Sequence, residues 1–169
     1  MRPALVDVII PVYNRGDQLL QCVESVIAQT YPHINIFVIE DGSALAKKYL
    51  SKTFGGTAAK KITYIGLNKN HGVSYCRNLG AGLSQGKYLA FIDSDDLWAC
   101  DKIEKQVDFL EKHTQYKWVH TNETWVKNGA TITQKKEHKK QEGIFVNRLL
   151  DRCLISPSSV FFLRDFFCD

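Results

Sequence analysis

Three carboxylate side chains lie within four residues in the segment 93–96, which reads Asp-Ser-Asp-Asp and is called the acidic segment below. Carboxylates this close repel one another unless a positive charge neutralises them. Mg²⁺ and Mn²⁺ prefer oxygen ligands and often join a carboxylate to the phosphates of a substrate. The Asp-x-Asp spacing lets one side chain reach a metal while the other reaches a sugar hydroxyl. This pattern predicts a metal and phosphate site, with a helix cap or turn as the alternative.

Other polar segments carry groups that suit a ligand. A carboxylate in the segment 40–43, Glu-Asp-Gly-Ser, can accept a hydrogen bond from a base or a ribose, and Gly42 permits a close backbone approach. The segment 70–72, Asn-His-Gly, precedes a helix that carries Arg77, and both helix N-termini and arginine favour phosphates. Tyr13 can stack on a base. An ordinary turn, a surface ion pair and packing at a strand end are the respective alternatives.

Apolar runs and breakers predict the elements that must position these residues. The continuous run Val-Ile-Ile at 8–10 indicates a strand buried on both faces, and Asp17 is expected to cap the helix that follows. Strands are predicted at 6–12, 34–39, 62–65 and 88–92, and helices at 18–29, 44–53, 73–83 and 101–113.

This alternation predicts an α/β fold with a mostly parallel sheet. Ligands of such sheets bind beyond the carboxyl ends of the strands, so the polar segments should converge on one crevice. Further along, residues 118–126 predict a strand or a hairpin arm. Residues 133–143 are polar and expected to be mobile, 144–151 look helical, and 159–163 predict a last strand.

Composition excludes several classes of protein. The length of 169 residues suits a single domain, and no apolar run approaches the roughly 20 residues that cross a bilayer. The five cysteines are odd in number and form no Cys-x-x-Cys pair, so we expect reduced thiols in a cytoplasmic protein. The net charge of +4 includes four lysines within residues 135–140, which predict a solvated loop. Nucleic-acid binding is disfavoured because no aromatic residues alternate with these lysines.

Four segments in this order resemble the family-two glycosyltransferases of the GT-A fold. They are Val-Ile-Ile-Pro-Val-Tyr-Asn at 8–14, Ile-Glu-Asp-Gly-Ser at 39–43, Asn-His-Gly at 70–72 with Arg77 and Asn78, and Phe-Ile-Asp-Ser-Asp-Asp at 91–96. The resemblance covers about the first 110 residues, and the segment 155–160 is similar to one common in bacterial members. It implies that residues 1–169 form one nucleotide-sugar-binding domain with a Rossmann-like, mostly parallel sheet flanked by helices.

The resemblance also implies roles for individual residues. Pro11, Tyr13 and Glu40 would line the base pocket, Arg77 would hold the nucleotide, and Asp93 would contact the ribose. The full set implied for the donor is Pro11, Tyr13, Asn14, Glu40, Asp41, Asn70, Gly72, Arg77, Asp93 and Ser94. Asp95, with Asp93, would ligate Mn²⁺ or Mg²⁺ on the diphosphate.

The implied reaction is an inverting transfer of a sugar, from UDP most commonly, to a hydroxyl of a glycan or lipid-linked acceptor. The implied process is synthesis of a surface polysaccharide or glycolipid, with no nucleic acid involved. The implied location is the cytoplasm, with peripheral association at the inner face of the membrane.

The chain departs from the family pattern at two places. Glu40 stands where the family has aspartate, which keeps the charge and changes the reach. The family's general base follows the segment resembling 159–167, and the chain ends at Asp169 before it. Asp151, Asp165 and Asp169 do not match that motif, so no catalytic residue is assigned. We therefore expect a fragment or a natural truncation, with a catalytically inactive nucleotide-sugar-binding fragment as the alternative function.

Overall fold

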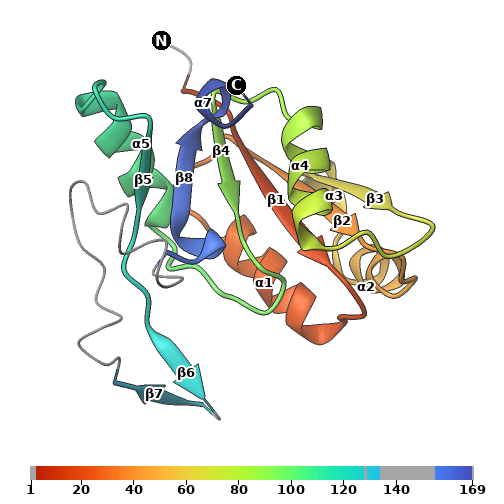
Figure 1. Ribbon diagram of the computed structural model, residues 1–169. Coiled ribbons are helices and arrows are strands. Elements are labelled where there is room, and N and C mark those ends of the chain that lie inside the picture. The colour runs from red at the N-terminus through yellow and green to blue at the C-terminus, as the bar shows by residue number, and fades with distance from the viewer. Residues whose placement is uncertain (1–2, 128, 134–154, 169) are drawn as a thin grey trace.

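The computed structural model describes residues 3–127, 129–133 and 155–168 (Figure 1). Its main sheet has six strands in the order β3-β2-β1-β4-β8-β5. The parallel strands are β1 (Val6–Val12), β2 (Ile34–Glu40), β3 (Ile62–Gly66) and β4 (Tyr88–Phe91). The strand β8 (Val160–Leu163) lies antiparallel between β4 and β5 (Trp118–His120). The predicted α/β fold with a mostly parallel sheet is confirmed.

Helices cover the sheet unequally on its two faces. The larger core packs α1 (Asp17–Ile27), α2 (Ala46–Thr53) and α5 (Lys102–Lys112) against one face. The other face carries α4 (Val73–Leu83) and the short α7 (Arg164–Cys168). Close packing of α4 depends on Gly80, because a Cβ there would lie 2.7 Å from the side chain of Ile9. The short helix α3 (Gly56–Lys60), which the sequence did not predict, leads into β3.

Most predicted bounds agree with the structure, including those of β1, and one predicted helix cap does not. The strand β1 runs through Pro11 to Val12. Pro11 costs no sheet hydrogen bond on the β4 side, because the pairing of β1 with β4 ends at Ile9 and Phe91. The prediction that Asp17 caps α1 is wrong: Gly16 is the N-cap, no side chain caps it, and Asp17 lies in the first turn.

The predicted segment 118–126 divides into two strands. β5 joins the main sheet, while β6 (Trp125–Lys127) pairs with β7 (Ala130–Ile132) in a separate hairpin that extends from the body (Figure 1). The predicted last strand is confirmed as β8, after the 3-10 turn η2 (Pro157–Ser159). The helix predicted at 144–151 and nearly all of the polar segment 133–143 lie outside the described residues.

Within the described part of the chain, no helix has the length and apolar character needed to span a membrane. Four cysteines are free thiols, as predicted, and the fifth, Cys153, lies outside the described residues. Cys22 and Cys76 are buried on α1 and α4. Burial raises the pKa of both thiols, that of Cys76 to about 11, so both pack as small apolar groups.

Candidate functional site

The acidic segment forms a tight turn at the end of β4. The Asp96 N–H donates to the Asp93 carbonyl oxygen at 2.9 Å, which closes the turn. Ser158, in η2, holds it from the other side: its hydroxyl accepts from the Asp93 N–H at 3.0 Å and donates to the Asp96 carboxylate at 2.5 Å. Trp98 fixes Ser158 in turn, because its indole N–H donates to the Ser158 carbonyl oxygen at 2.8 Å. The turn is therefore rigidly attached to the C-terminal part of the sheet.

Each carboxylate of the acidic segment has a different partner. Arg77 of α4 meets Asp93 at 2.5 Å, and Arg15 of the loop after β1 meets Asp95 at 3.1 Å. Partial burial raises the pKa of Asp96, and the nearby charges of Asp93 and Asp95 raise it further, against the lowering effect of the Ser158 hydroxyl. The segment is thus rich in negative charge. Among the described residues, no three or more acidic, histidine or cysteine side chains are grouped as a complete metal site.

Asp41 builds the loop at the start of α4. Its two carboxylate oxygens accept hydrogen bonds from the N–H groups of His71 and Gly72 at 2.7 and 2.8 Å. Asn70 lies close by, with its side-chain N–H donating to the Asp41 carbonyl oxygen at 3.4 Å. Gly72 has φ +91° as the N-cap of α4, a value that favours glycine. The segment 70–72 and the end of β2 therefore form one unit, as the convergence of strand ends requires.

Glu40 points into the protein, on the same face of β2 as Val38. Its carboxylate accepts from the Ser43 hydroxyl at 2.7 Å, the N–H groups of Leu45 and Ala46 at 2.8 and 3.0 Å, and the Tyr64 hydroxyl at 2.7 Å. Burial alone would raise its pKa, but these hydrogen bonds outweigh burial and lower it.

Glu40 therefore holds the start of α2 and the end of β2 together. That Glu40 contacts a base stays a prediction, and a base would have to reach a buried carboxylate that already accepts four hydrogen bonds within the protein.

The end of β1 completes the site. Asn14 has φ 52°, and its N–H donates to the Ser43 hydroxyl at 3.0 Å, which joins the loop after β1 to that after β2. Tyr13 is 55% exposed, so its ring is free to meet a ligand. Pro11 and Ser94 are buried at the ends of β1 and β4. The predicted convergence of the polar segments on one edge of the sheet is confirmed.

The structure adds three residues that sequence reasoning missed. Arg15 was signalled only by its place in the polar loop after β1. Ser158 was signalled only by the family resemblance of the segment 155–160, which gave it no role. Tyr64 gave no signal, because it lies within a predicted strand and not in a polar strand-end segment. Asp165 lies elsewhere: its carboxylate pairs with Arg164, whose guanidinium donates to the Ser84 carbonyl oxygen at the opposite edge of the sheet.

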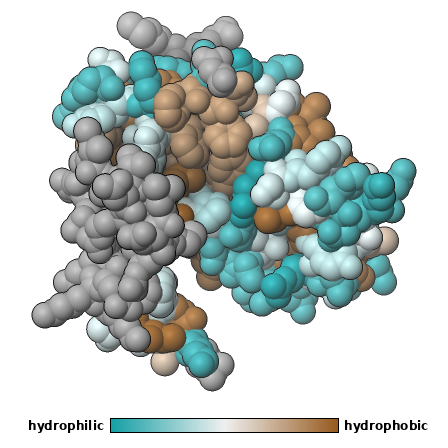
Figure 2. All heavy atoms as spheres, in the orientation of Figure 1, coloured by the Kyte–Doolittle hydropathy of each residue, from teal (hydrophilic) through white to brown (hydrophobic). Residues whose placement is uncertain are grey.

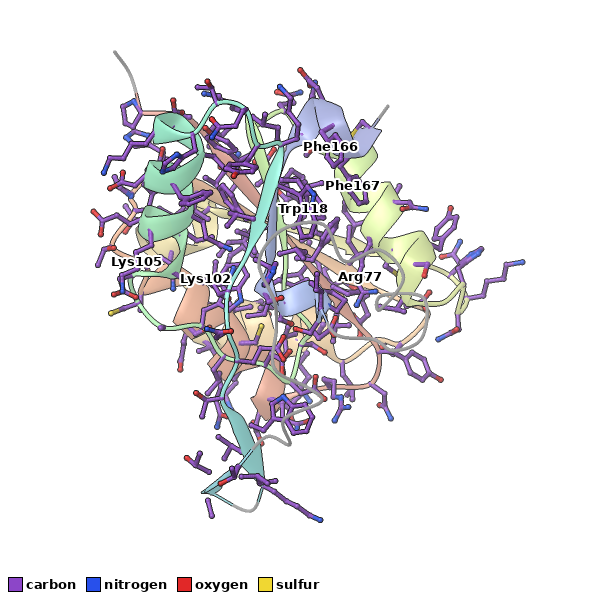
Figure 3. The ribbon with its side chains drawn as sticks, turned by 60° about the vertical axis from the view of Figure 1, so that its left-hand side comes forward. Arg77, Lys102, Lys105, Trp118, Phe166 and Phe167 are labelled. Carbon is purple, nitrogen blue, oxygen red and sulfur yellow. The ribbon has the colours of Figure 1, made fainter. Side chains whose placement is uncertain are left out.

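An apolar cavity of about 240 Å³ adjoins Arg77. It lies between α4, η2, β8 and α7 and is lined by Ser74, Arg77, Asn78, Phe91, Ile155, Pro157, Val160, Phe162 and Phe167. Figure 2 shows apolar side chains gathered over β4, β8 and α7. Phe167, which is labelled together with Arg77 in Figure 3, lines this cavity with it, and the ring centroids of Phe162 and Phe167 lie 5.4 Å apart. The site is therefore charged at the strand ends and apolar beside them.

Comparison with known proteins gives a consistent match. A sequence model described as glycosyl transferase family 2 matches residues 7–167. A putative teichuronic acid biosynthesis glycosyltransferase, TuaG of Bacillus subtilis, is 36% identical over 106 residues, 63% of this chain and 42% of that protein.

Two solved structures are similar in fold. TarS 1-349 of S. aureus in complex with UDP-GlcNAc matches with a TM-score of 0.76 and 20% identity, over 96% of this chain and 46% of that chain. The mannosyltransferase PcManGT of Pyrobaculum calidifontis, in complex with GDP-Man and Mn²⁺, matches with a TM-score of 0.69 and 18% identity, over 97% and 46%. The chain spans between 14% and 44% of the length of the curated relatives it matches.

Proposed function

Because the chain belongs to glycosyl transferase family 2, we propose that it binds a nucleotide-diphosphate sugar, preferably a UDP-sugar, at the carboxyl ends of β1, β2 and β4. The observation that carries this proposal is the meeting of Asp93, Asp95 and Arg77 at one edge of the sheet. A diphosphate needs cations beside it, and a ribose needs acceptors, and this edge offers both. The UDP-GlcNAc and GDP-Man complexes of TarS and PcManGT support the class of ligand.

The donor would lie along the strand ends. Tyr13 would stack on the base, Asp93 would accept from the ribose hydroxyls, and Arg77 would hold the nucleotide. Glu40 and Asp41 would act by shaping the pocket, since their oxygens already accept hydrogen bonds within the protein. The complete proposed set is Pro11, Tyr13, Asn14, Glu40, Asp41, Asn70, Gly72, Arg77, Asp93 and Ser94.

A divalent cation fits these residues when a diphosphate supplies further oxygens. Asp95 is a half-exposed carboxylate, and the group that meets it is a cation, the Arg15 guanidinium. Mg²⁺ and Mn²⁺ sites commonly use one or two carboxylates with substrate phosphates in place of a complete protein cage. Asp95 and Asp93 would hold the metal. When bound, Mn²⁺ or Mg²⁺ would supply Lewis-acid stabilisation of the departing diphosphate.

The proposed activity is transfer of the sugar to an acceptor hydroxyl with inversion, on a glycan or lipid-linked acceptor of a surface polysaccharide or glycolipid. The name of TuaG, a putative teichuronic acid biosynthesis glycosyltransferase, supports the proposed role in polysaccharide synthesis. The proposed location is the cytoplasm, which the free thiols of Cys22 and Cys76 support. Peripheral attachment to the inner face of the membrane is a further part of the proposal.

A second candidate function is donor binding by these residues without completed transfer. Inversion needs a general base beside the acceptor hydroxyl. Asp165 is the one acidic residue within the described segment 155–168, and it lies at the opposite edge of the sheet from Asp95. Asp165 is therefore not placed to supply that base.

Calorimetric titration with UDP and GDP, each with and without Mn²⁺, tests the donor proposal. We expect UDP to bind more tightly with Mn²⁺, and Asp95→Asn to weaken binding by about tenfold or more. Asp108→Asn is the matched control, because Asp108 is an exposed carboxylate on α5 that pairs only loosely with Lys112, at 3.9 Å. Equal effects of the two substitutions would remove the support for a metal at Asp95.

Measurement of donor hydrolysis and of sugar transfer with the same protein distinguishes the two candidate functions. Turnover above background that depends on Mn²⁺ would support transfer by these residues. UDP-sugar binding without turnover would support the binding function.

A further inference from the structure

Arg15 connects the loop after β1 to the acidic segment. One terminal nitrogen of its guanidinium donates to the Gln18 side-chain oxygen at 2.6 Å, and the other donates to the Asp95 carboxylate at 3.1 Å. Arg15 and Asp95 are 80 residues apart in the chain and about equally exposed, with side-chain exposures of 42% and 45%. The carboxylate proposed to ligate the metal is therefore already neutralised by a cation of the protein itself.

A guanidinium and a divalent cation compete for the same carboxylate oxygen. Arginine stays protonated in proteins, so its charge cannot be switched off. A metal on Asp95 would repel the Arg15 guanidinium at this short distance. An exposed ion pair contributes little to stability, so this pair opens at small cost. Binding of metal at Asp95 is therefore opposed by the guanidinium, and it is favoured when Arg15 moves away.

Arg77 differs from Arg15 in the length of its ion pair and in the exposure of its side chain. Its ion pair with Asp93 is shorter, at 2.5 Å, and its side chain is only 18% exposed. Asp96 is occupied by the Ser158 hydroxyl and offers Arg15 no replacement. Of the two cations among the described residues that form ion pairs with the acidic segment, Arg15 is the more exposed and the better able to change partner.

We propose that Arg15 is a positioning residue that exchanges partners: it holds Asp95 before the donor arrives and turns to the diphosphate once metal and nucleotide bind. This inference rests on the proposed donor site. The diphosphate is the nearest new anion, and the Gln18 contact keeps the guanidinium within the site during the exchange. The exchange makes metal binding depend on the nucleotide, because metal alone must displace Arg15 without offering it a new partner.

Mn²⁺ titrations followed by the EPR signal of free Mn²⁺ test this exchange in the unmodified chain and in Arg15→Gln, with and without UDP. We expect Arg15→Gln to bind Mn²⁺ alone about threefold to fivefold more tightly, because the competing cation is gone. We expect the same variant to bind UDP with Mn²⁺ about fivefold more weakly, because the diphosphate loses a partner. The two affinities of Arg15→Lys, which keeps the charge, should lie between those of the unmodified chain and those of Arg15→Gln.

Effects of opposite sign on the two affinities are the specific result. Lys47→Gln removes an exposed charge from α2 and should change neither affinity. Tighter binding of both ligands in Arg15→Gln would mean simple repulsion of Mn²⁺, and unchanged Mn²⁺ affinity would mean no competition; either result overturns the exchange. If UDP binds the unmodified chain with Mn²⁺ and only the Arg15 result fails, the donor site stands. If UDP does not bind at all, both proposals fall.

Discussion

Gly42→Ala places one methyl group where the end of β2 passes the loop before α4. Gly42 has φ +76°, and a Cβ built there lies 2.4 Å from both Asn70 N and Lys69 C and 2.8 Å from Lys69 Cα. These are backbone atoms, so no side-chain rotation can relieve the overlap. The same loop is held by the bonds from the His71 and Gly72 N–H groups to Asp41. The substitution should therefore weaken both the fold and the donor site.

The expected loss of unfolding free energy has two parts, and the same substitution at a second glycine, Gly56, measures one of them alone. An alanine in the left-handed region costs about 1–2 kcal/mol. Overlap with well-packed atoms adds about 1–3 kcal/mol. Gly56 also has a positive φ, +58°, but a Cβ there meets nothing within 4 Å, so Gly56→Ala should show the first part alone. We expect a loss of about 2–5 kcal/mol for Gly42→Ala and about 1–2 kcal/mol for Gly56→Ala.

Urea denaturation of the two variants and the unmodified protein measures this difference. Melting temperatures provide a second reading, at about 2–4 °C per kcal/mol for a chain of this size. Calorimetry with UDP and Mn²⁺ measures the local effect, and only Gly42→Ala should weaken binding. Losses of stability that agree within about 0.5 kcal/mol would refute the reasoning, since the overlap at the Asn70 loop would then cost nothing.

Four further substitutions probe the contacts around the site. Tyr64→Phe should lower the free energy of unfolding in urea by about 1.5–3 kcal/mol, because Glu40 loses a donor; a smaller loss than about 0.5 kcal/mol would contradict this. Glu40 has a lowered pKa, so its charged form stabilises the fold above its ordinary value of 4.5 and that contribution is lost as the pH falls below it. Glu40→Gln should flatten the fall of unfolding free energy between about pH 5 and pH 3, and an equally steep fall would count against it. Ser158→Ala should weaken UDP binding with Mn²⁺ by about fivefold in calorimetry by loosening the turn at Asp96, and an unchanged affinity would exclude this role. Arg77→Lys should weaken UDP binding with Mn²⁺ by about tenfold or more, because lysine cannot reproduce the guanidinium contacts. An unchanged melting temperature would separate this effect from unfolding.

The elements of this fold were predictable because they depend on local patterns. The apolar run in β1 and the helical spacing in α4 placed both elements at their observed bounds. Alternation of strands and helices then required the parallel strands to end at one edge, so the convergence of Asp41 and Asp93 followed from topology. The helix α3 was missed because its five residues show no helical spacing of apolar side chains.

The inward direction of Glu40 was partly predictable. Residues two apart on a strand share a face, so Glu40 lies with Ile36 and Val38. The sequence did not show that the start of α2 and Tyr64 of β3 face this carboxylate, and these contacts with Ser43 give it four donors. The acidic residue was visible in the sequence, whereas its environment was not.

The sequence by itself determined the family, the order of elements and the set of strand-end residues, because apolar periodicity and short motifs are local properties. The tertiary structure alone decided which of those residues meet. Arg15 reaches Asp95 across 80 positions and Ser158 reaches Asp96 across 62, and the antiparallel β8 enters the sheet beside β4. Such contacts depend on how loops place charged and polar groups after the sheet has formed, and no periodic pattern in the chain records that placement.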